Sequence, residues 1–274
     1  MFLAACIQLR CTMDIERNLE MTEALVRRAA KAGAKLIATP ENTSLLGPQF
    51  HKVDLAQPVD GEIGQRLSRL AQETETFLLI GSLNEERRLS DGQIDAQRCY
   101  NTSLLFGPDG TLMERYRKIH LFDVDVPGGL SVRESDTICP GDTVTVANTP
   151  LGKLGMSICY DLRFPELYRM HVDQGADMIA IPSAFTLTTG KDHWHALLRA
   201  RAIETQCWVL APAQWGIHDD EGKRQSYGHS VIIDPWGTIV AECGDGEGIC
   251  YAEINLDYTQ EVRTAIPVRN HRRV

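Results

Sequence analysis

The stretch Gly155–Leu167, with the sequence GMSICYDLRFPEL, places a cysteine between an apolar segment and the start of an expected helix. Residues 154–158 are predicted to form a short buried strand. Pro165 suits the first turn of a helix, because its missing N–H would have no partner there. Cys159 then lies in the tight connection after the strand, where α/β proteins present a nucleophile. Position alone also allows a buried, unreactive cysteine.

The two halves of the chain share three blocks of sequence in the same order. Residues 3–8 (LAACIQ) correspond to residues 154–159 (LGMSIC), and residues 33–40 (GAKLIATP) correspond to residues 175–182 (GADMIAIP). The third block is Y-x-x-S, three apolar residues and x-P-x-G-T, and it begins at Tyr100 and again at Tyr227, 127 residues later. Three ordered matches indicate an internal duplication.

Each half is expected to contain two strand–helix units, a third strand and a β-hairpin. In the first half, the apolar periodicity predicts helices at residues 17–32 and 62–75 and strands at residues 2–8, 36–39, 77–83, 101–106 and 111–116. Strands joined through helices run parallel, whereas hairpin strands run antiparallel. We therefore expect an α/β fold, a four-layer α-β-β-α sandwich with an internal pseudo-two-fold duplication, in a single domain of residues 1–274.

The duplication predicts where Glu41 and Cys159 lie. Cys159 corresponds to Gln8 at the end of the first strand, and Glu41 corresponds to Ser183 at the end of the second strand. Neighbouring parallel strands end at the same rim of a sheet, where α/β proteins bind ligands. Each half is therefore expected to supply residues to one site. A long connection, residues 117–142, is also expected to have a specific role.

The composition is that of an ordinary globular protein, with 43% hydrophobic residues, 24% charged residues and a net charge of −9. An acidic chain is not expected to bind nucleic acid or an anionic membrane. No stretch is long and apolar enough for a membrane span or a secretory signal. The eight cysteines form no C-x-x-C pair, so we expect free thiols and a reducing, cytoplasmic location.

A cysteine nucleophile needs a base or a nearby cation, because an unperturbed thiol is mostly protonated at neutral pH. Histidine is the usual base, but the His193-x-His195 pair would point about 200° apart on a helix. A zinc site of this pair with Cys207 is therefore not favoured. A cysteine–histidine pair is not favoured either, because no histidine has the Asn or Asp spacing of a familiar cysteine protease signature.

Glu41, Lys118 and Glu134 are better candidates for the group that activates Cys159. Each is expected on a loop or at a strand end rather than in an amphipathic face. Taken singly, each residue could also be a surface charge.

Together with Cys159, these residues give the chain a resemblance to the nitrilase superfamily of carbon–nitrogen hydrolases over nearly its whole length. The matching segments are residues 40–42 (PEN), 116–123 (YRKIHLFD), 134–135 (ES), 155–167, 182–185 (PSAF), 193–194 (HW) and 199–204 (RARAIE). The resemblance implies the sandwich fold, with Glu41 as general base, Lys118 as cationic stabiliser, Cys159 as nucleophile and Glu134 as a second carboxylate. It implies no metal and no organic cofactor.

The chemistry implied is amide hydrolysis through a thioester. Glu41 would accept the thiol proton, and Cys159 would attack the carbonyl carbon. Lys118 and the backbone N–H of Tyr160 would meet the developing oxyanion. Ammonia would leave, and water activated by Glu41 would release the carboxylate product.

Two branches of the superfamily are similar in further segments. Residues 199–207, 211–218 and 224–238 are similar to deaminated glutathione amidases, which we favour. Residues 118–126 and 188–190 are shared with omega-amidases, which act on alpha-ketoglutaramate. Both substrates are small amides that carry a carboxylate. Arg163 could bind this carboxylate through two parallel hydrogen bonds. The alternative is that Arg163 forms a surface ion pair with Glu166. The resemblance places Thr189 near that carboxylate and Phe185 in the pocket.

Two other functions stay open: a true nitrilase, and a non-catalytic relative that only binds a metabolite. A binding protein needs no nucleophile, so the Glu, Lys, Glu, Cys set favours an enzyme. The resemblance also implies a homodimer or larger homo-oligomer, with the basic C-terminal segment, residues 269–274, in the subunit contacts.

Overall fold

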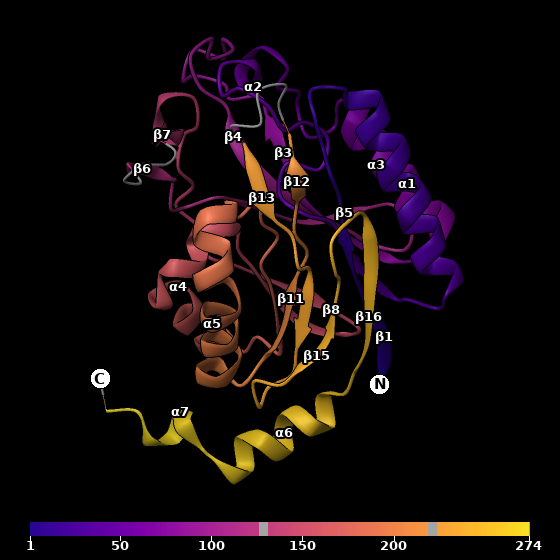
Figure 1. The fold of residues 1–274 in the computed structure, drawn as a ribbon, viewed down its shortest axis with the longest axis vertical. Helices are drawn as coiled ribbons and strands as arrows, with labels where there is room; N and C mark the ends of the chain where they lie inside the picture. Colours follow the sequence, from indigo (N-terminus) through magenta and orange to yellow (C-terminus); the bar gives the residue numbers. More distant parts are fainter. Residues whose placement is uncertain (126–130, 219–223, 274) are drawn as a thin grey trace.

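Two six-stranded mixed sheets form the centre of the computed structural model, which describes residues 1–125, 131–218 and 224–273 (Figure 1). The strand order of the first sheet is β16-β1-β2-β3-β4-β5. Its elements and the helices between them are β1 (Phe2–Gln8), α1 (Ile15–Lys31), β2 (Leu36–Ala38), α2 (His51–Asp54), α3 (Glu62–Thr74), β3 (Phe77–Glu85), β4 (Tyr100–Phe106), β5 (Leu112–Arg117) and β16 (Gly248–Ile254).

The second sheet has the strand order β15-β14-β11-β10-β9-β8. Its elements and the helices between them are β8 (Thr145–Thr149), β9 (Gly152–Met156), the 3₁₀ helix η2 (Cys159–Arg163), α4 (Pro165–Asp173), β10 (Met178–Ala180), α5 (Leu187–Thr205), β11 (Trp208–Ala211), β14 (Val231–Ile233) and β15 (Ile239–Glu242). The remaining elements are β6 (Asp123–Asp125), β7 (Ser131–Arg133), η1 (Glu134–Asp136), β12 (Trp215–Ile217), β13 (Gln225–Tyr227), α6 (Leu256–Ala265) and α7 (Val268–His271).

The two sheets repeat one topology, as the duplicated sequence blocks predicted. Strands β1, β2 and β3 are parallel and are followed by the antiparallel pair β4 and β5. Strands β9, β10 and β11 are likewise parallel and are followed by β14 and β15. Each sheet also has one extra antiparallel strand beside its first strand, β16 in one sheet and β8 in the other.

The alternation of side chains along β1 builds the layers. Ala4 and Cys6 belong to the core cluster that also contains Met156 and Ile158 of the second half. Ala5 and Ile7 point the other way and pack with the apolar faces of α1 and α3. Helices α4 and α5 lie on the opposite side of the molecule from α1 and α3 (Figure 1). The fold is therefore the expected α-β-β-α sandwich.

Helix boundaries follow the chemistry of their first residues. The side chain of Asp14 accepts a hydrogen bond from the N–H of Arg17, so α1 begins at Ile15, two residues before the predicted start. Helix α4 begins at Pro165, as the sequence predicts. Strand β9 ends at Met156, earlier than the predicted Ile158, because the chain turns away from the sheet before Cys159.

The long connection between β5 and β8 has more regular structure than the sequence indicated. It forms the two-stranded sheet of β6 and β7 and the 3₁₀ helix η1. The predicted connection also includes residues 126–130, which lie outside the described residues.

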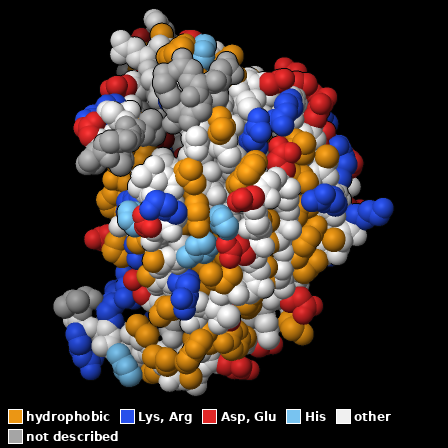
Figure 2. Space-filling view, in the orientation of Figure 1, with side chains coloured by type: hydrophobic (Ala, Val, Ile, Leu, Met, Phe, Trp, Pro, Cys, Tyr) orange, Lys and Arg blue, Asp and Glu red, His pale blue; other side chains and the backbone are white. Residues whose placement is uncertain are grey.

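The surface in Figure 2 has acidic and basic side chains side by side over α1 and α3 rather than a patch of one sign. Ion pairs such as Arg27 with Glu73 and Arg66 with Glu16 account for this mixture. Among the described helices, none combines the length and the apolar character needed to cross a membrane.

Gly81 in β3 should be essential for the turn that carries Glu41. A Cβ at this position would collide with the backbone oxygens of Thr39 and Pro40. We expect Gly81→Ala to lower the free energy of unfolding by about 1–3 kcal/mol or more, measured by chemical denaturation. Gly244→Ala is the matched control, because its Cβ would meet nothing within 4 Å, and it should change stability by less than about 0.5 kcal/mol. Equal denaturation midpoints for Gly81→Ala and Gly244→Ala would contradict the close approach of β3 to the turn.

Candidate active site

One cavity of about 500 Å³ is lined by every residue that the sequence indicated for the site. These residues come from both halves of the fold and are Glu41, Lys118, Glu134, Cys159, Tyr160, Arg163, Phe185 and Thr189. The cavity lies where β2, β5, β9 and β10 end, so the shared rim expected from the duplication exists.

Cys159 occupies a strained position in the turn after β9. Its φ angle is +49°, a left-handed conformation that few non-glycine residues adopt. The Cys159 N–H donates to the carbonyl oxygen of Pro182 at 2.9 Å, which ties the turn to the segment after β10. The residue is 8% exposed. Strain of this kind is typical of functional turns, where the surrounding structure enforces the conformation.

Both carboxylate oxygens of Glu41 have partners. Oε1 accepts from Lys118 Nζ and from Asn101 Nδ2, each at 2.9 Å, and Oε2 accepts from the N–H of Ala184 at 2.9 Å. The last contact joins the end of β2 to the end of β10, so the two halves meet at this side chain. Asn42 follows Glu41 in a left-handed conformation, with a φ angle of +59°.

Lys118 is almost completely buried and lies between two carboxylates. Its Nζ is 2.9 Å from Glu41 Oε1 and 2.9 Å from Glu134 Oε2. Burial disfavours the ammonium, but the charges of Glu134 and Glu41 outweigh this effect and raise the pKa of Lys118 well above its usual value. The backbone N–H of Phe122 also donates to Glu134, at 2.7 Å, and fixes that carboxylate.

The charges in this cluster also determine the protonation states of Glu41 and Cys159. Burial works against ionisation of Glu41, but the ammonium groups of Lys118 and then Lys52 outweigh it and lower the Glu41 pKa. Burial and the negative charge of Glu41 raise the pKa of Cys159 well above its usual value. At neutral pH the pair is therefore a carboxylate beside a protonated thiol, which is the arrangement that a general base requires.

Sequence reasoning missed Lys52, which lines the cavity, and two buried polar residues that hold the site together. Asn101 bridges the carboxylates of Glu41 and Glu134, at 2.9 and 3.3 Å. Asp161 is fully buried and accepts hydrogen bonds from Tyr116, from His120 and from the N–H of Ile158. Asp161 thereby joins the turn of Cys159 to the end of β5. A carboxylate two residues after Cys159 was the available signal for it.

The backbone N–H of Tyr160 is available to a ligand. It donates to no group within residues 1–125, 131–218 and 224–273, and the residue lines the cavity. Tyr160 packs edge-on against Phe122 and Phe164, which holds it in place.

Arg163 lines the cavity and, in the described part of the chain, does not form the ion pair with Glu166 that the sequence left open as an alternative. Its guanidinium lies 5.1 Å from the Phe185 ring and donates weakly to His193 Nδ1 at 3.3 Å. Thr189 Oγ1 is hydrogen-bonded to Thr186 Oγ1 at 2.8 Å.

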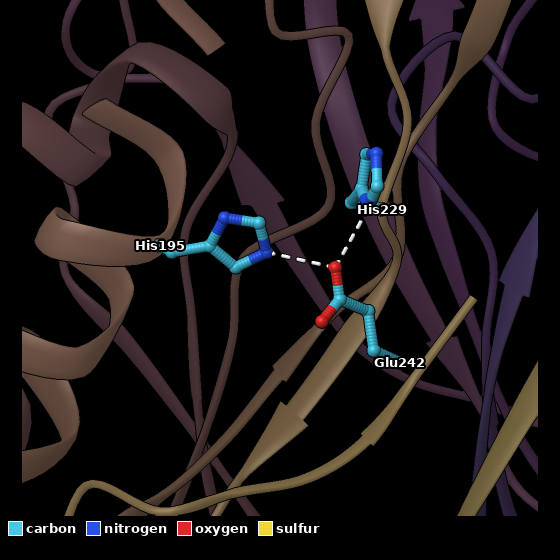
Figure 3. A group of neighbouring side chains, drawn as sticks. All are labelled: His195, His229 and Glu242. Carbon is cyan, nitrogen blue, oxygen red and sulfur yellow. Dashed lines mark hydrogen bonds and ion pairs between the residues drawn. The ribbon is translucent and has the colours of Figure 1, made fainter. Parts of the chain in front are cut away.

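A separate group of side chains joins α5 to β15 (Figure 3). His195 Nε2 and His229 Nδ1 lie 2.9 and 2.7 Å from the same oxygen of Glu242. Two imidazoles and a carboxylate are a donor set that can hold zinc. Within the described residues, this is the group of His, Cys, Asp or Glu side chains whose possible ligand atoms all lie within 4.8 Å of one another. It does not line the cavity, and it is a different set from the His193, His195 and Cys207 combination that the sequence did not favour.

The comparisons with known proteins agree with this geometry. The carbon–nitrogen hydrolase family model matches residues 3–264. The chain is 42% identical to a Bos taurus protein named deaminated glutathione amidase, over 99% of this chain and 82% of that protein. It is 40% identical to the Mus musculus omega-amidase NIT2, over 99% and 95%.

A solved structure supports the same assignment. Nit3 of Saccharomyces cerevisiae, described as a member of branch 10 of the nitrilase superfamily, superposes with a TM-score of 0.87 at 34% identity, covering 100% of this chain and 97% of that one. With its duplicated sandwich and its buried Glu, Lys, Glu, Cys cluster, the chain belongs to the carbon–nitrogen hydrolase family of the nitrilase superfamily and is an amide-hydrolysing enzyme of that class.

Proposed function

We propose that this enzyme hydrolyses a linear amide through a thioester on Cys159. The observation that carries the proposal is the Lys118 ammonium held between Glu41 and Glu134 in the cavity that Cys159 lines. A carboxylate base, a thiol and a fixed cation are the three groups that acyl transfer to sulfur requires.

In the first half-reaction, Glu41 accepts the proton of the Cys159 thiol as the sulfur attacks the carbonyl carbon. The carbonyl oxygen gains negative charge, which Lys118 and the N–H of Tyr160 stabilise. One such donor typically contributes about 10²–10³ in rate. The C–N bond then breaks, and the departing amine takes the proton from Glu41. The acyl group remains on sulfur as a thioester.

In the second half-reaction, Glu41 accepts a proton from water as the water oxygen attacks the thioester carbon. The S–C bond breaks, the carboxylic acid product leaves, and the Cys159 sulfur recovers its proton from Glu41. Glu134 and Asn101 keep Lys118 and Glu41 in position through both steps.

The substrate that we propose is deaminated glutathione. Support comes from the Bos taurus relative of that name and from the matching segments at residues 199–207, 211–218 and 224–238. An omega-amidase acting on alpha-ketoglutaramate is the second candidate, because the Mus musculus relative is almost equally similar. In either case Arg163 and Thr189 would bind the carboxylate of the acyl part, and Phe185 would line the pocket beside it.

The amine product differs between the two candidates. Alpha-ketoglutaramate is an unsubstituted amide and releases ammonia, as expected from the sequence. In deaminated glutathione the reacting amide joins the 2-oxoglutaryl group to cysteinylglycine, so the leaving amine is that dipeptide. Release of ammonia is therefore expected only with alpha-ketoglutaramate.

We also propose a homo-oligomer in a reducing, cytoplasmic environment. The eight cysteines all lie within the described residues and are buried free thiols. Large apolar side chains are about half exposed at Met170, Ile203, Trp236 and Ile266. Apolar surface also gathers along the lower edge of Figure 2, near α6, which supports a subunit contact there. Analytical ultracentrifugation would report the number of subunits.

Replacing the proposed nucleophile should abolish turnover. We expect Cys159→Ala to form no 2-oxoglutarate from deaminated glutathione while its melting temperature changes little. Mass spectrometry of acid-quenched wild-type protein should find the acyl adduct on Cys159. Cys139→Ala, outside the cavity lining, should keep its activity. Turnover by Cys159→Ala would refute the assignment, and binding without any adduct or product in the wild type would favour a non-catalytic relative.

The dependence of kcat/KM on pH should show a broad plateau. Glu41 must be ionised, and its pKa is lowered from the usual 4.5, so its protonation reduces activity only below that value. Lys118 must be protonated, and its pKa is raised above 10.5, so its loss lies on the alkaline side. With alpha-ketoglutaramate as the substrate, we expect constant kcat/KM from about pH 6 to pH 9. An inflection inside that range, with the protein still folded, would contradict the carboxylate–thiol pair.

Arg163→Ala should weaken the binding of the acyl carboxylate. A charge-assisted hydrogen bond lost in this way should lower kcat/KM for alpha-ketoglutaramate by about 10- to 100-fold, mainly through KM. Arg169→Ala is the control, because Arg169 contacts the carbonyl oxygen of Glu204 and does not line the cavity. A change of less than about threefold for Arg163→Ala would rule out this role. Rates with the matching nitrile would show whether the enzyme prefers amides.

A further inference from the structure

Two buried lysines line the cavity, and among the described residues only one of them has a partner for its ammonium. Lys118 is 2% exposed and contacts two carboxylates. Lys52, on the short helix α2, is 4% exposed, yet its ammonium has no hydrogen bond or ion pair within residues 1–125, 131–218 and 224–273. A largely buried charge without a protein partner is unfavourable, and Lys52 lines the cavity. A ligand in the cavity can supply the missing anion.

Two hydrogen bonds hold the backbone at Lys52. Its N–H donates to the carbonyl oxygen of Gln49 at 3.0 Å, and its own carbonyl oxygen accepts from the Cys99 thiol at 3.5 Å. Burial lowers the pKa of Lys52, although the charges of Glu134 and Glu41 partly oppose this effect. An anionic ligand beside the ammonium would restore the charged form.

Two residues that line the cavity carry unsatisfied acceptors. Gln49 Oε1 and Asn42 Oδ1 are buried and have no hydrogen-bond partner in the described residues. Both residues line the cavity with Lys52. An ammonium and two carbonyl acceptors match a ligand that has a carboxylate and N–H groups, which is the composition of a peptide with a free C-terminus.

Lys52 is separate from the cation already assigned to the acyl part of the substrate. The charges that act on Lys52 are those of Glu134, Glu41, Lys118 and Arg224. Arg163 instead contacts His193 and the rings of Phe185 and Tyr160. Lys52 comes from the first half of the duplicated fold, whereas Arg163 comes from the second. The cavity therefore has two cationic regions, with the catalytic cluster lining it as well.

We propose that Lys52, together with the side-chain amides of Gln49 and Asn42, binds the amine side of the substrate through a carboxylate on the leaving group. This inference rests on the proposed amidase function and narrows its substrate class to amides whose leaving amine is an acidic or peptide-like molecule. A substrate that releases only ammonia would leave this region without an anion.

Three substrates with one acyl group test the proposal. They are deaminated glutathione, the same compound with its glycine carboxylate converted to a carboxamide, and alpha-ketoglutaramate. Each is assayed for release of 2-oxoglutarate by the wild-type protein, by Lys52→Met and by the control Lys31→Met. Lys31 lies at the exposed end of α1, and methionine is close to lysine in volume.

With the wild type, we expect kcat/KM for deaminated glutathione to exceed that for the carboxamide analogue by about 10- to 100-fold. Lys52→Met should remove this preference, mainly by raising KM for deaminated glutathione. It should change kcat/KM for the other two substrates by less than about threefold. Lys31→Met should behave as the wild type does with all three.

Several outcomes would overturn the proposal. Equal losses for all three substrates in Lys52→Met would mean that Lys52 acts only on the charges of the catalytic cluster. Equal wild-type rates for the carboxylate and the carboxamide, or turnover of alpha-ketoglutaramate alone, would mean that no such site exists, and these comparisons need no variant to fold. Absence of 2-oxoglutarate from all three substrates would instead refute the proposed amidase function.

Discussion

The structure depends on the contact between one buried ammonium and two buried carboxylates. Glu41 and Glu134 are each 3% exposed, and two negative charges so close together would not both stay ionised without a cation. The ammonium of Lys118 is shared between them, and the amide of Asn101 donates to both. Any shift that separated these groups would leave a charge buried alone, so the surrounding backbone has little freedom.

This constraint explains why the site lies between the two halves. Glu41 follows β2 and Lys118 follows β5, both in the first half, whereas Cys159 and the Ala184 N–H follow strands of the second half. Asp161 adds a second link, because its carboxylate accepts from Tyr116 of β5 while it holds the turn of Cys159. The sandwich thus positions the reacting groups through strand ends, which move less than loops.

Sequence reasoning predicted the features that local patterns encode. Apolar periodicity indicated β1 and α1, and the repeated blocks predicted two equivalent sheets and one rim that carries Glu41 and Cys159. It missed Asn101, Asp161 and Lys52, because only long-range packing decides whether a polar side chain is buried. The four-residue helix α2 is too short for any periodic signal. The direction of Arg163 likewise depended on α5, far away in sequence.

Strand β16 shows how the order of synthesis constrains this fold. It pairs with β1 along its full length, from Phe2 opposite Ile254 to Gln8 opposite Gly248. The first sheet therefore keeps an open edge until residues 248–254 have been synthesised, and an open edge of apolar residues invites pairing with other chains. Closing a sheet across such a sequence separation is slow. The pairing of β1 therefore cannot be complete until residues 248–254 are present, although β1 itself lies at the start of the chain.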